Sequence, residues 1–372
     1  MTSNENREGY ARLPEDLLKD LLEGAGNVVD EVVSLLTPVL DSREHLRRGL
    51  QDLGLIQTFE VSDPSSIAGV DGGFVVERTS AVDLSLVVAV GVEGLGPTTT
   101  IWDSTQYEWW TNVARHDTDA DRLARGVMVA SEISILEAAP HHFRILDGSH
   151  LTLVIQLNSA LSSESRDVRQ EARRVWTRLG TANGLAAVCS TPNVVAMPKY
   201  DSSQTIVNRL EEQLGLPMSG DDKYLMGLVL EPGELLVPQQ MPEDPWHSLH
   251  FNAGSVADRD IEDAFTTAIL PLKERKLMFT YFKPDAFSPA FRLEIKSEPG
   301  QVDLDLLCST LSSQITGPFI REPYPQYLAD VMAKSVSLGI SALQTAVQLG
   351  LSSMGRPEIS EMLLRSYRTE GI

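Results

Sequence analysis

Cysteine, long apolar runs and positive charge are all scarce in this sequence. Two cysteines, Cys189 and Cys308, occur in 372 residues, and there is no CxxC spacing. A disulfide framework and a cysteine-based zinc site are therefore excluded. No apolar run reaches the roughly 20 residues that cross a bilayer, and the polar N-terminus lacks the apolar core of a secretion signal. We therefore expect a cytoplasmic protein without a membrane segment.

Basic residues are outnumbered, with 31 Lys and Arg against 52 Asp and Glu, which gives a formal net charge of −21. A protein that binds DNA by itself usually has the opposite balance, because basic side chains must neutralise phosphates. An acidic chain can still act on DNA if metal ions offset local carboxylates, if a few basic side chains line one groove, or if a partner holds the strand. The composition therefore disfavours an independent DNA-binding protein.

Hydrophobic periodicity divides the chain into three parts. Leucine and valine recur at helical spacing from Leu13 to about Gly54. This pattern predicts that residues 1–60 form a helical N-terminal region, packed on the main domain or available for docking or dimerisation. Residues 61–345 alternate strand-like and helical segments, with an irregular insertion at about 201–275. This order predicts an α/β domain with a mixed sheet flanked by helices. Residues 346–372 are expected to form a C-terminal helical extension.

Strand-like segments are concentrated in the first half of the predicted domain. They read IAGVDGGFVVERT, VDLSLVVAVGVE and TTTIWDST, and their order predicts an antiparallel meander. A helix from about Asp119 to Ala139 follows, and then a short strand, FRILDGS. Nearer the C-terminus, LMFTYFKP and AFRLEIKSE predict a hairpin.

Two aspartates each end an apolar strand and precede a glycine. They are Asp71 in AGVDGG and Asp147 in FRILDGS. Taken singly, each also fits a turn, because Asp-Gly pairs are common in hairpins. Two copies in an α/β context favour carboxylates that converge at neighbouring strand ends, where Mg²⁺ or Mn²⁺ finds the oxygen ligands it prefers.

Further acids occur on predicted helices. Glu132, in VMVASEISILE, projects from an otherwise apolar face. Because burial without a partner is costly, we interpret it either as a metal ligand or as the partner of a buried arginine. Glu137 is the competing candidate, although it lies near the helix end at Pro140. Asp330, in EPYPQYLADVMAK, is by composition an ordinary helix start where the dipole favours an acid.

Two other patterns have weaker functional interpretations. Trp109 and Trp110 could stack on unpaired bases, but packing in the core or a dimer contact explains them as well. His247 and His250 have an HxxH spacing but lack the companion glutamate of a zinc-binding helix.

The order of these motifs resembles the NurA family of DNA-end-processing nucleases. GVDGG, a helical glutamate, LDGS, a strand ending in lysine, a hairpin and PYPQYLADVMAK follow one another between about Ser65 and Thr345. The resemblance implies an RNase H-like fold with two Mn²⁺ or Mg²⁺ ions, and it places Lys199 near the scissile phosphate. The implied metal ligands are Asp71, Glu132, Asp147 and Asp330. Two positions depart from the family pattern: GVDGG replaces the more usual GVDGS, and Asp330 stands where some relatives have histidine.

The same resemblance implies a metal-dependent DNA exonuclease, with single-strand endonuclease activity as an option, acting in DNA-end resection for repair or in anti-phage defence. It also implies a homodimer that works with a HerA-type hexameric translocase ATPase. Such a motor would supply the DNA affinity that an acidic chain lacks, and residues 1–55 are the candidate docking element. The alternatives are another RNase H-like nuclease, such as a resolvase, and a non-catalytic subunit that gates or caps a DNA motor.

Overall fold

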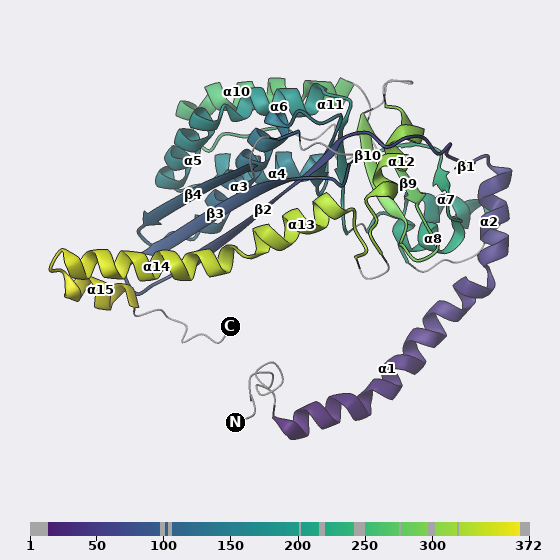
Figure 1. The fold of residues 1–372 in the computed structure, drawn as a ribbon, viewed down its shortest axis with the longest axis horizontal. Coiled ribbons are helices and arrows are strands. Elements are labelled where there is room, and N and C mark those ends of the chain that lie inside the picture. The colour runs from purple at the N-terminus through teal and green to yellow at the C-terminus, as the bar shows by residue number, and fades with distance from the viewer. Residues whose placement is uncertain are drawn as a thin grey trace.

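Ten strands form one mixed sheet in the computed structural model of the chain (Figure 1). The structure describes residues 14–96, 101–102, 106–200, 202–215, 220–241, 250–274, 277–296, 302–317 and 320–364. The strands are β1 (Ile56–Thr58), β2 (Ile67–Arg78), β3 (Asp83–Glu93), β4 (Gln106–Ala114), β5 (Phe143–Asp147), β6 (Val194–Met197), β7 (Glu234–Leu236), β8 (Gln239–Gln240), β9 (Leu277–Lys283) and β10 (Phe291–Lys296).

The strand order is β1-β7-β9-β10-β6-β5-β2-β3-β4, and β8 pairs with β9. β5 runs parallel to both β2 and β6, whereas the other pairs are antiparallel. The carboxyl end of β5 therefore lies at the centre of the sheet, beside β2 on one side and the end of β6 on the other.

Most of the described helices pack against this sheet. They are α1 (Glu15–Asp41), α2 (Arg43–Asp52), α3 (Ala120–Ala138), α4 (His150–Leu161), α5 (Arg166–Leu179), α6 (Thr181–Ser190), α7 (Thr205–Leu214), α8 (Asp222–Val229), η1 (Val256–Asp258), α10 (Arg259–Ala268), α11 (Leu270–Glu274), α12 (Leu304–Ser313), α13 (Tyr324–Lys334), α14 (Val336–Ser353) and α15 (Pro357–Leu364). None of the helices within the described ranges combines the length and apolar character needed to span a bilayer.

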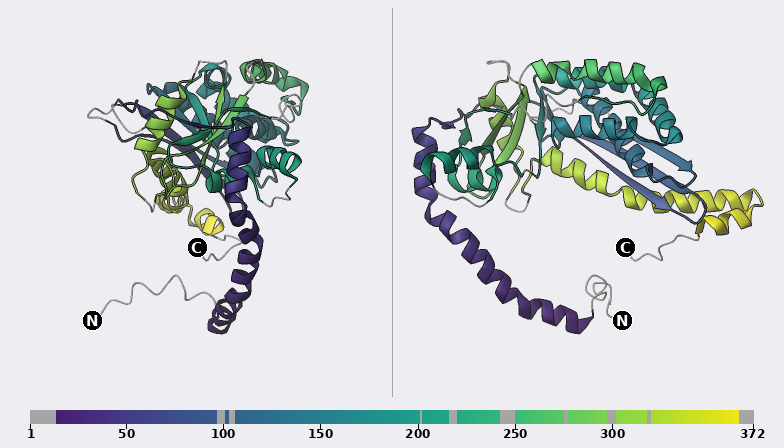
Figure 2. Two further views of the ribbon diagram at one scale, coloured as in Figure 1. Left: turned by 90° about the vertical axis from the view of Figure 1, so that its right-hand side faces the viewer. Right: turned by 180° about the vertical axis from the view of Figure 1, so that it is seen from behind.

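Two helical layers enclose the β2–β4 half of the sheet (Figures 1 and 2). On one face, α3 to α6 bury apolar side chains such as Ile133 against Val87 in the largest core cluster. On the other face, α14 packs Val336 and Ile340 against Leu84. At the other end of the sheet, α2, α7 and α8 cover β9 and form a separate core cluster.

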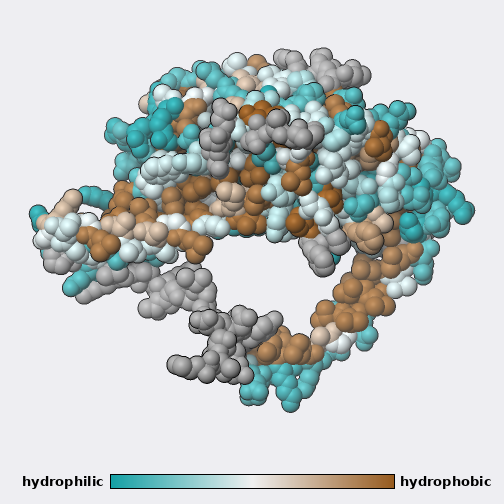
Figure 3. Space-filling view, in the orientation of Figure 1, coloured by the Kyte–Doolittle hydropathy of each residue, from teal (hydrophilic) through white to brown (hydrophobic). Residues whose placement is uncertain are grey.

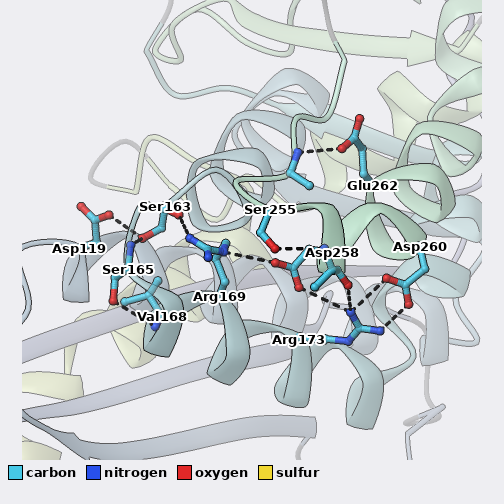
Figure 4. A network of polar contacts seen from close by, with 12 residues as sticks. Asp119, Ser163, Ser165, Val168, Arg169, Arg173, Ser255, Asp258, Asp260 and Glu262 are labelled. Atoms are coloured by element: carbon cyan, nitrogen blue, oxygen red, sulfur yellow. Dashed lines mark hydrogen bonds and ion pairs between the residues drawn. The ribbon is translucent and has the colours of Figure 1, made fainter.

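A polar network joins the insertion to α5 (Figure 4). The Arg169 guanidinium donates to Asp258 at 3.2 Å, and Arg173 pairs with both Asp258 and Asp260. Ser163, just before α5, donates to Asp119 at the start of α3. These contacts fix η1 and α10 on the helical layer that carries Glu132.

α1 leaves the body of the molecule and, among the described elements, lies close to its neighbour α2 (Figures 1 and 2). Its exposed large apolar side chains are Leu17, Leu21, Leu22, Val28, Val29, Val32, Val33, Leu35 and Leu40. By contrast, α2 buries Leu46 and Leu50 against α7 and α8. α1 thus has apolar side chains that no other described residue of this chain covers.

The predicted fold class is confirmed: a mixed sheet flanked by helices, with helical N- and C-terminal regions. The expected hairpin is also confirmed as β9 and β10. The third strand of the meander was predicted wrongly at TTTIWDST, because Ile101 and Trp102 form a bend and the strand begins at Gln106; the rest of that segment lies outside the described residues. The division into residues 1–60, 61–345 and 346–372 stays a prediction.

Candidate metal centre

Asp71 lies in β2 between two glycines that share its face of the sheet. Because strand residues alternate in direction, Gly69, Asp71 and Gly73 all face α13. A Cβ on Gly69 would lie 2.8 Å from the backbone nitrogen of Gln326, and one on Gly73 would lie 2.3 Å from the carbonyl oxygen of Ala333. The glycines of AGVDGG therefore leave room for α13 and allow that helix to pack against Asp71.

Asp147 is the last residue of β5, in a parallel register that puts it beside Asp71. Gly148 has a φ of +98°, a conformation that favours glycine, and it turns the chain into α4. The Ser149 hydroxyl caps that helix by accepting a backbone N–H. The LDGS sequence thus supplies a strand end, a sharp turn and a helix cap in succession, and this turn sets the direction of the Asp147 carboxylate.

Asp330 comes from α13, and it completes a cluster of three carboxylates. One oxygen each from Asp71, Asp147 and Asp330 lies within 4.8 Å of the others. Pro325 fits the first turn of α13, where its missing N–H costs nothing. Since the three acids come from two strands and a helix, the cluster depends on both the sheet register and the docking of α13.

Lys199 follows β6 and places its ammonium group among the acids. Its Nζ is 3.0 Å from Asp147 Oδ2, 2.9 Å from Asp330 Oδ1 and 3.2 Å from Glu322 Oε2. Burial lowers the pKa of Lys199, but Asp147 and Asp330 outweigh burial, so the net pKa is raised and the amine stays protonated. Lys199 therefore compensates part of the negative charge of the cluster.

Two residues of the site were missed by the sequence analysis. Glu322 pairs with Lys199, and Gln326 donates from Nε2 to Asp147 Oδ1 at 2.8 Å and to the Met197 carbonyl at 3.1 Å. Both belong to the EPYPQYLADVMAK segment that carries Asp330. Their position in the same motif as Asp330 could have marked them as site residues. Only the packing of α13 on the sheet shows that they reach the strand ends.

The pKa of Asp71 is raised by burial and by the neighbouring carboxylate of Asp147. Burial is the largest cause that raises the pKa of Asp71, to about 8, and the charge and hydrogen bond of Asp147 act in the same direction. The Lys199 ammonium and the Gly72 amide, 2.7 Å from Asp71 Oδ1, oppose the rise. Asp71 is therefore largely protonated at neutral pH without metal, and a divalent cation would displace that proton.

Glu132 lies across β2 from this cluster. A Cβ on Gly72 would lie 2.5 Å from Glu132 Oε1, so the missing side chain makes room for the carboxylate. Glu132 is 5% exposed. Burial, followed by the charges of Asp71 and Asp147, raises its pKa well above the usual range. Within the described ranges no ion pair to Glu132 is present, which disfavours the arginine alternative, and the competing Glu137 is exposed.

This donor set fits a hard divalent cation. Three converging carboxylates supply the oxygen ligands that suit Mg²⁺ and Mn²⁺. The charges of Asp71 and Asp147 raise the pKa of Glu132, but Glu132 does not belong to the group of three. Its role as a ligand, and the number of ions, stay predictions.

The weaker candidates fall elsewhere. Trp110 is buried in the core and donates to Glu171 at 3.1 Å, whereas Trp109 on the edge strand β4 is 57% exposed. His247 lies outside the described residues, so the HxxH pattern with His250 is not tested.

No protein-family model matches the chain, and no curated protein is significantly similar to it in sequence. Solved structures do resemble it. The NurA nuclease from Sulfolobus solfataricus aligns with a TM-score of 0.54 at 14% identity and covers 86% of this chain and 98% of that chain. A crystal structure of NurA with manganese aligns with a TM-score of 0.52 at 10% identity, covering 84% and 93%. The fold of this chain is therefore NurA-like.

Proposed function

We propose that this chain is a divalent-metal-dependent deoxyribonuclease. The observation that carries the proposal is the convergence of three aspartates from β2, β5 and α13 on a NurA-like fold, with the buried Glu132 behind them. A partly buried cluster of acids with one lysine is costly for folding, and a site for cations explains its presence.

The proposed metal ligands are Asp71, Glu132, Asp147 and Asp330. Two bound Mn²⁺ or Mg²⁺ ions would supply an activated water and stabilise charge on the scissile phosphate. Lys199 then turns from the carboxylates towards a phosphate oxygen and donates a hydrogen bond to it. Gln326 holds the Asp147 carboxylate in place through its 2.8 Å hydrogen bond.

Cleavage assays with aspartate variants test this proposal. Wild type, Asp71→Ala and Asp147→Ala are incubated with Mn²⁺ and with single-stranded, duplex, branched and DNA–RNA hybrid substrates. Asp263→Ala, an exposed position on α10, is the matched control. We expect cleavage by wild type and the control and none by the other two. Equal activity in all four proteins contradicts the proposal, and no activity in any, with or without a motor, favours a non-catalytic subunit.

A translocating motor is the partner that we propose for this nuclease. The net charge of −21 limits the affinity of the chain for DNA, and a HerA-type hexameric ATPase that feeds DNA to a homodimer would overcome this limit. The proposed settings are DNA-end processing and anti-phage defence. The apolar side of α1, visible in Figure 3, is the candidate docking surface, because its large apolar side chains are exposed among the described residues.

The docking surface is tested with point variants of α1. Leu22→Ser and Val29→Ser remove exposed apolar side chains, and Asp20→Ser changes a polar neighbour on the same helix. Co-purification with a HerA-type motor is expected to fail for the first two and to persist for the third. Unchanged binding by all three contradicts the assignment. Light scattering on the same samples reports whether the free chain is a dimer.

A further inference from the structure

A buried carboxylate lies behind the turn that carries Asp147. Glu294 is on β10, two strands away from β5 in the sheet, and is 1% exposed. Its Oε2 accepts hydrogen bonds from the Ser149 hydroxyl at 2.8 Å and from the His150 backbone N–H at 3.1 Å. Glu294 therefore forms hydrogen bonds with both residues that follow Asp147 and Gly148.

The charge of Glu294 is maintained in spite of its burial. Burial raises its pKa, but contacts with His150, Arg292 and Ser149 outweigh burial and leave the pKa below its usual range. Arg292 lies 3.4 Å from Oε1. The His150 ring is wholly buried, and burial lowers its pKa, although the contact with Glu294 opposes this shift. An anion held at the first turn of α4 also interacts favourably with the helix dipole.

Stability alone is a weak reason for such an arrangement. A buried ion pair is often no more stabilising than apolar side chains of the same volume, and the Ser149 hydroxyl already caps α4 without Glu294. Glu294 adds hydrogen bonds between the turn after β5 and a side chain on β10. It ties the LDGS turn to β10, so the turn cannot rotate independently of the sheet.

We propose that Glu294 is a positioning residue, which fixes the Asp147 carboxylate for metal binding by anchoring the backbone and hydroxyl of the turn. The inference rests on the proposed function, since it concerns the same metal centre. Residues behind metal ligands commonly affect metal affinity by about 10–100-fold when they are removed.

Calorimetric titration of the full-length chain with Mn²⁺ tests the proposal without measuring catalysis. We expect Glu294→Ala to weaken Mn²⁺ binding by about tenfold. Glu294→Gln should recover most of that loss, because an amide oxygen still accepts hydrogen bonds from the turn. Glu234→Ala is the control: Glu234 is also a buried acid paired with an arginine, 2.6 Å from Arg47, but it lies on β7 outside the cluster. It should lower the melting temperature and leave Mn²⁺ affinity unchanged.

Ser149→Ala removes the hydroxyl bond of this anchor, together with the α4 cap, and leaves the His150 N–H bond in place. It costs one oxygen atom, so it serves if Glu294→Ala does not fold. Wild-type Mn²⁺ affinity in Ser149→Ala or in a folded Glu294→Ala overturns the inference. So does an equal loss in Glu294→Gln and Glu294→Ala. If the wild-type protein still cleaves DNA in these cases, the proposed nuclease function stands and only the role of Glu294 is wrong. Absence of both Mn²⁺ binding and cleavage in the wild type overturns the proposed function and this inference together.

Discussion

At the scale of one residue, Asp71 shows that sequence patterns identified some residues of the site and missed others. Its neighbours in AGVDGG also fit a hairpin turn, and only a parallel strand ending in Asp147 converts it into part of a site. The sequence indicated that Asp71 and Asp147 belong together, because each ends an apolar strand and precedes a glycine. It could not reveal Glu322, whose ion pair with Lys199 depends on how a distant helix docks.

The raised pKa of Asp71 predicts the pH dependence of the metal-free protein. Its ordinary pKa of 3.8 rises to about 8 in the folded state, so the folded state binds more protons than the unfolded state between these values. The contribution of Asp71 to stability is complete below about pH 4 and is lost as the pH rises to about 8.

The difference in unfolding free energy between wild type and Asp71→Asn isolates this contribution. Measured by urea unfolding with EDTA from pH 5.5 to 8.5, wild type should lose stability relative to the variant as the pH rises. Saturating Mn²⁺ should reverse the trend in wild type. Parallel curves for the two proteins would show that Asp71 is not protonated in the fold.

Glu132 and Glu137 give a second test at the residue scale. Glu132→Gln should leave the metal-free protein at least as stable as wild type, because a neutral amide replaces a buried carboxyl of similar shape. We expect its Mn²⁺ affinity to fall by about tenfold or more. Glu137→Gln, on the exposed side of the same helix, should match wild type in both measurements. The reverse result would transfer the ligand role to Glu137.

At the scale of elements, the glycines of β2 decide how closely helices approach the strand. Gly72 accommodates Glu132 from α3, and Gly73 accommodates the backbone of α13 on the opposite face. Periodicity located α3 well, because its apolar face is continuous. It could not locate the third strand, β4, because its alternating pattern follows a bend that also contains apolar residues.

Gly73→Ala is therefore expected to separate α13 from the sheet. The added Cβ would lie 2.3 Å from the Ala333 carbonyl oxygen, and overpacking of this kind costs about 1–3 kcal/mol. Since Asp330 moves with the helix, Mn²⁺ affinity should fall as well. Gly26→Ala on α1, which meets nothing within 4 Å, should be neutral or slightly stabilising. Thermal unfolding and Mn²⁺ titration compare the two, and equal behaviour contradicts the packing argument.

For the whole molecule, the net charge follows from the amino-acid composition alone. A net charge of −21 predicts weak DNA binding through few phosphate contacts. The logarithm of the binding constant should fall with the logarithm of salt concentration by a slope of about −2 to −4, where six to ten contacts would give about −5 to −9. Fluorescence anisotropy with a labelled duplex in Ca²⁺ measures the slope. A steep slope would mean that the chain binds DNA without help.

The arrangement of α1 was less accessible from sequence. Helical periodicity ran without distinction from Leu13 to about Gly54, yet α2 belongs to the core and α1 projects from it (Figure 2). The difference depends on partners, because both helices are amphipathic and only α2 finds a complementary surface on α7 and α8. A sequence pattern identifies an apolar face but not what covers it.

The central claim is that Asp71, Asp147 and Asp330 hold divalent metal. Anomalous diffraction at the manganese edge, from crystals of the full-length chain grown with Mn²⁺, tests it most directly. We predict an anomalous peak bonded to oxygens of all three aspartates, with Lys199 displaced from them. A fully ordered site with Lys199 still paired to Asp147 and Asp330 and no peak between the carboxylates would contradict the account.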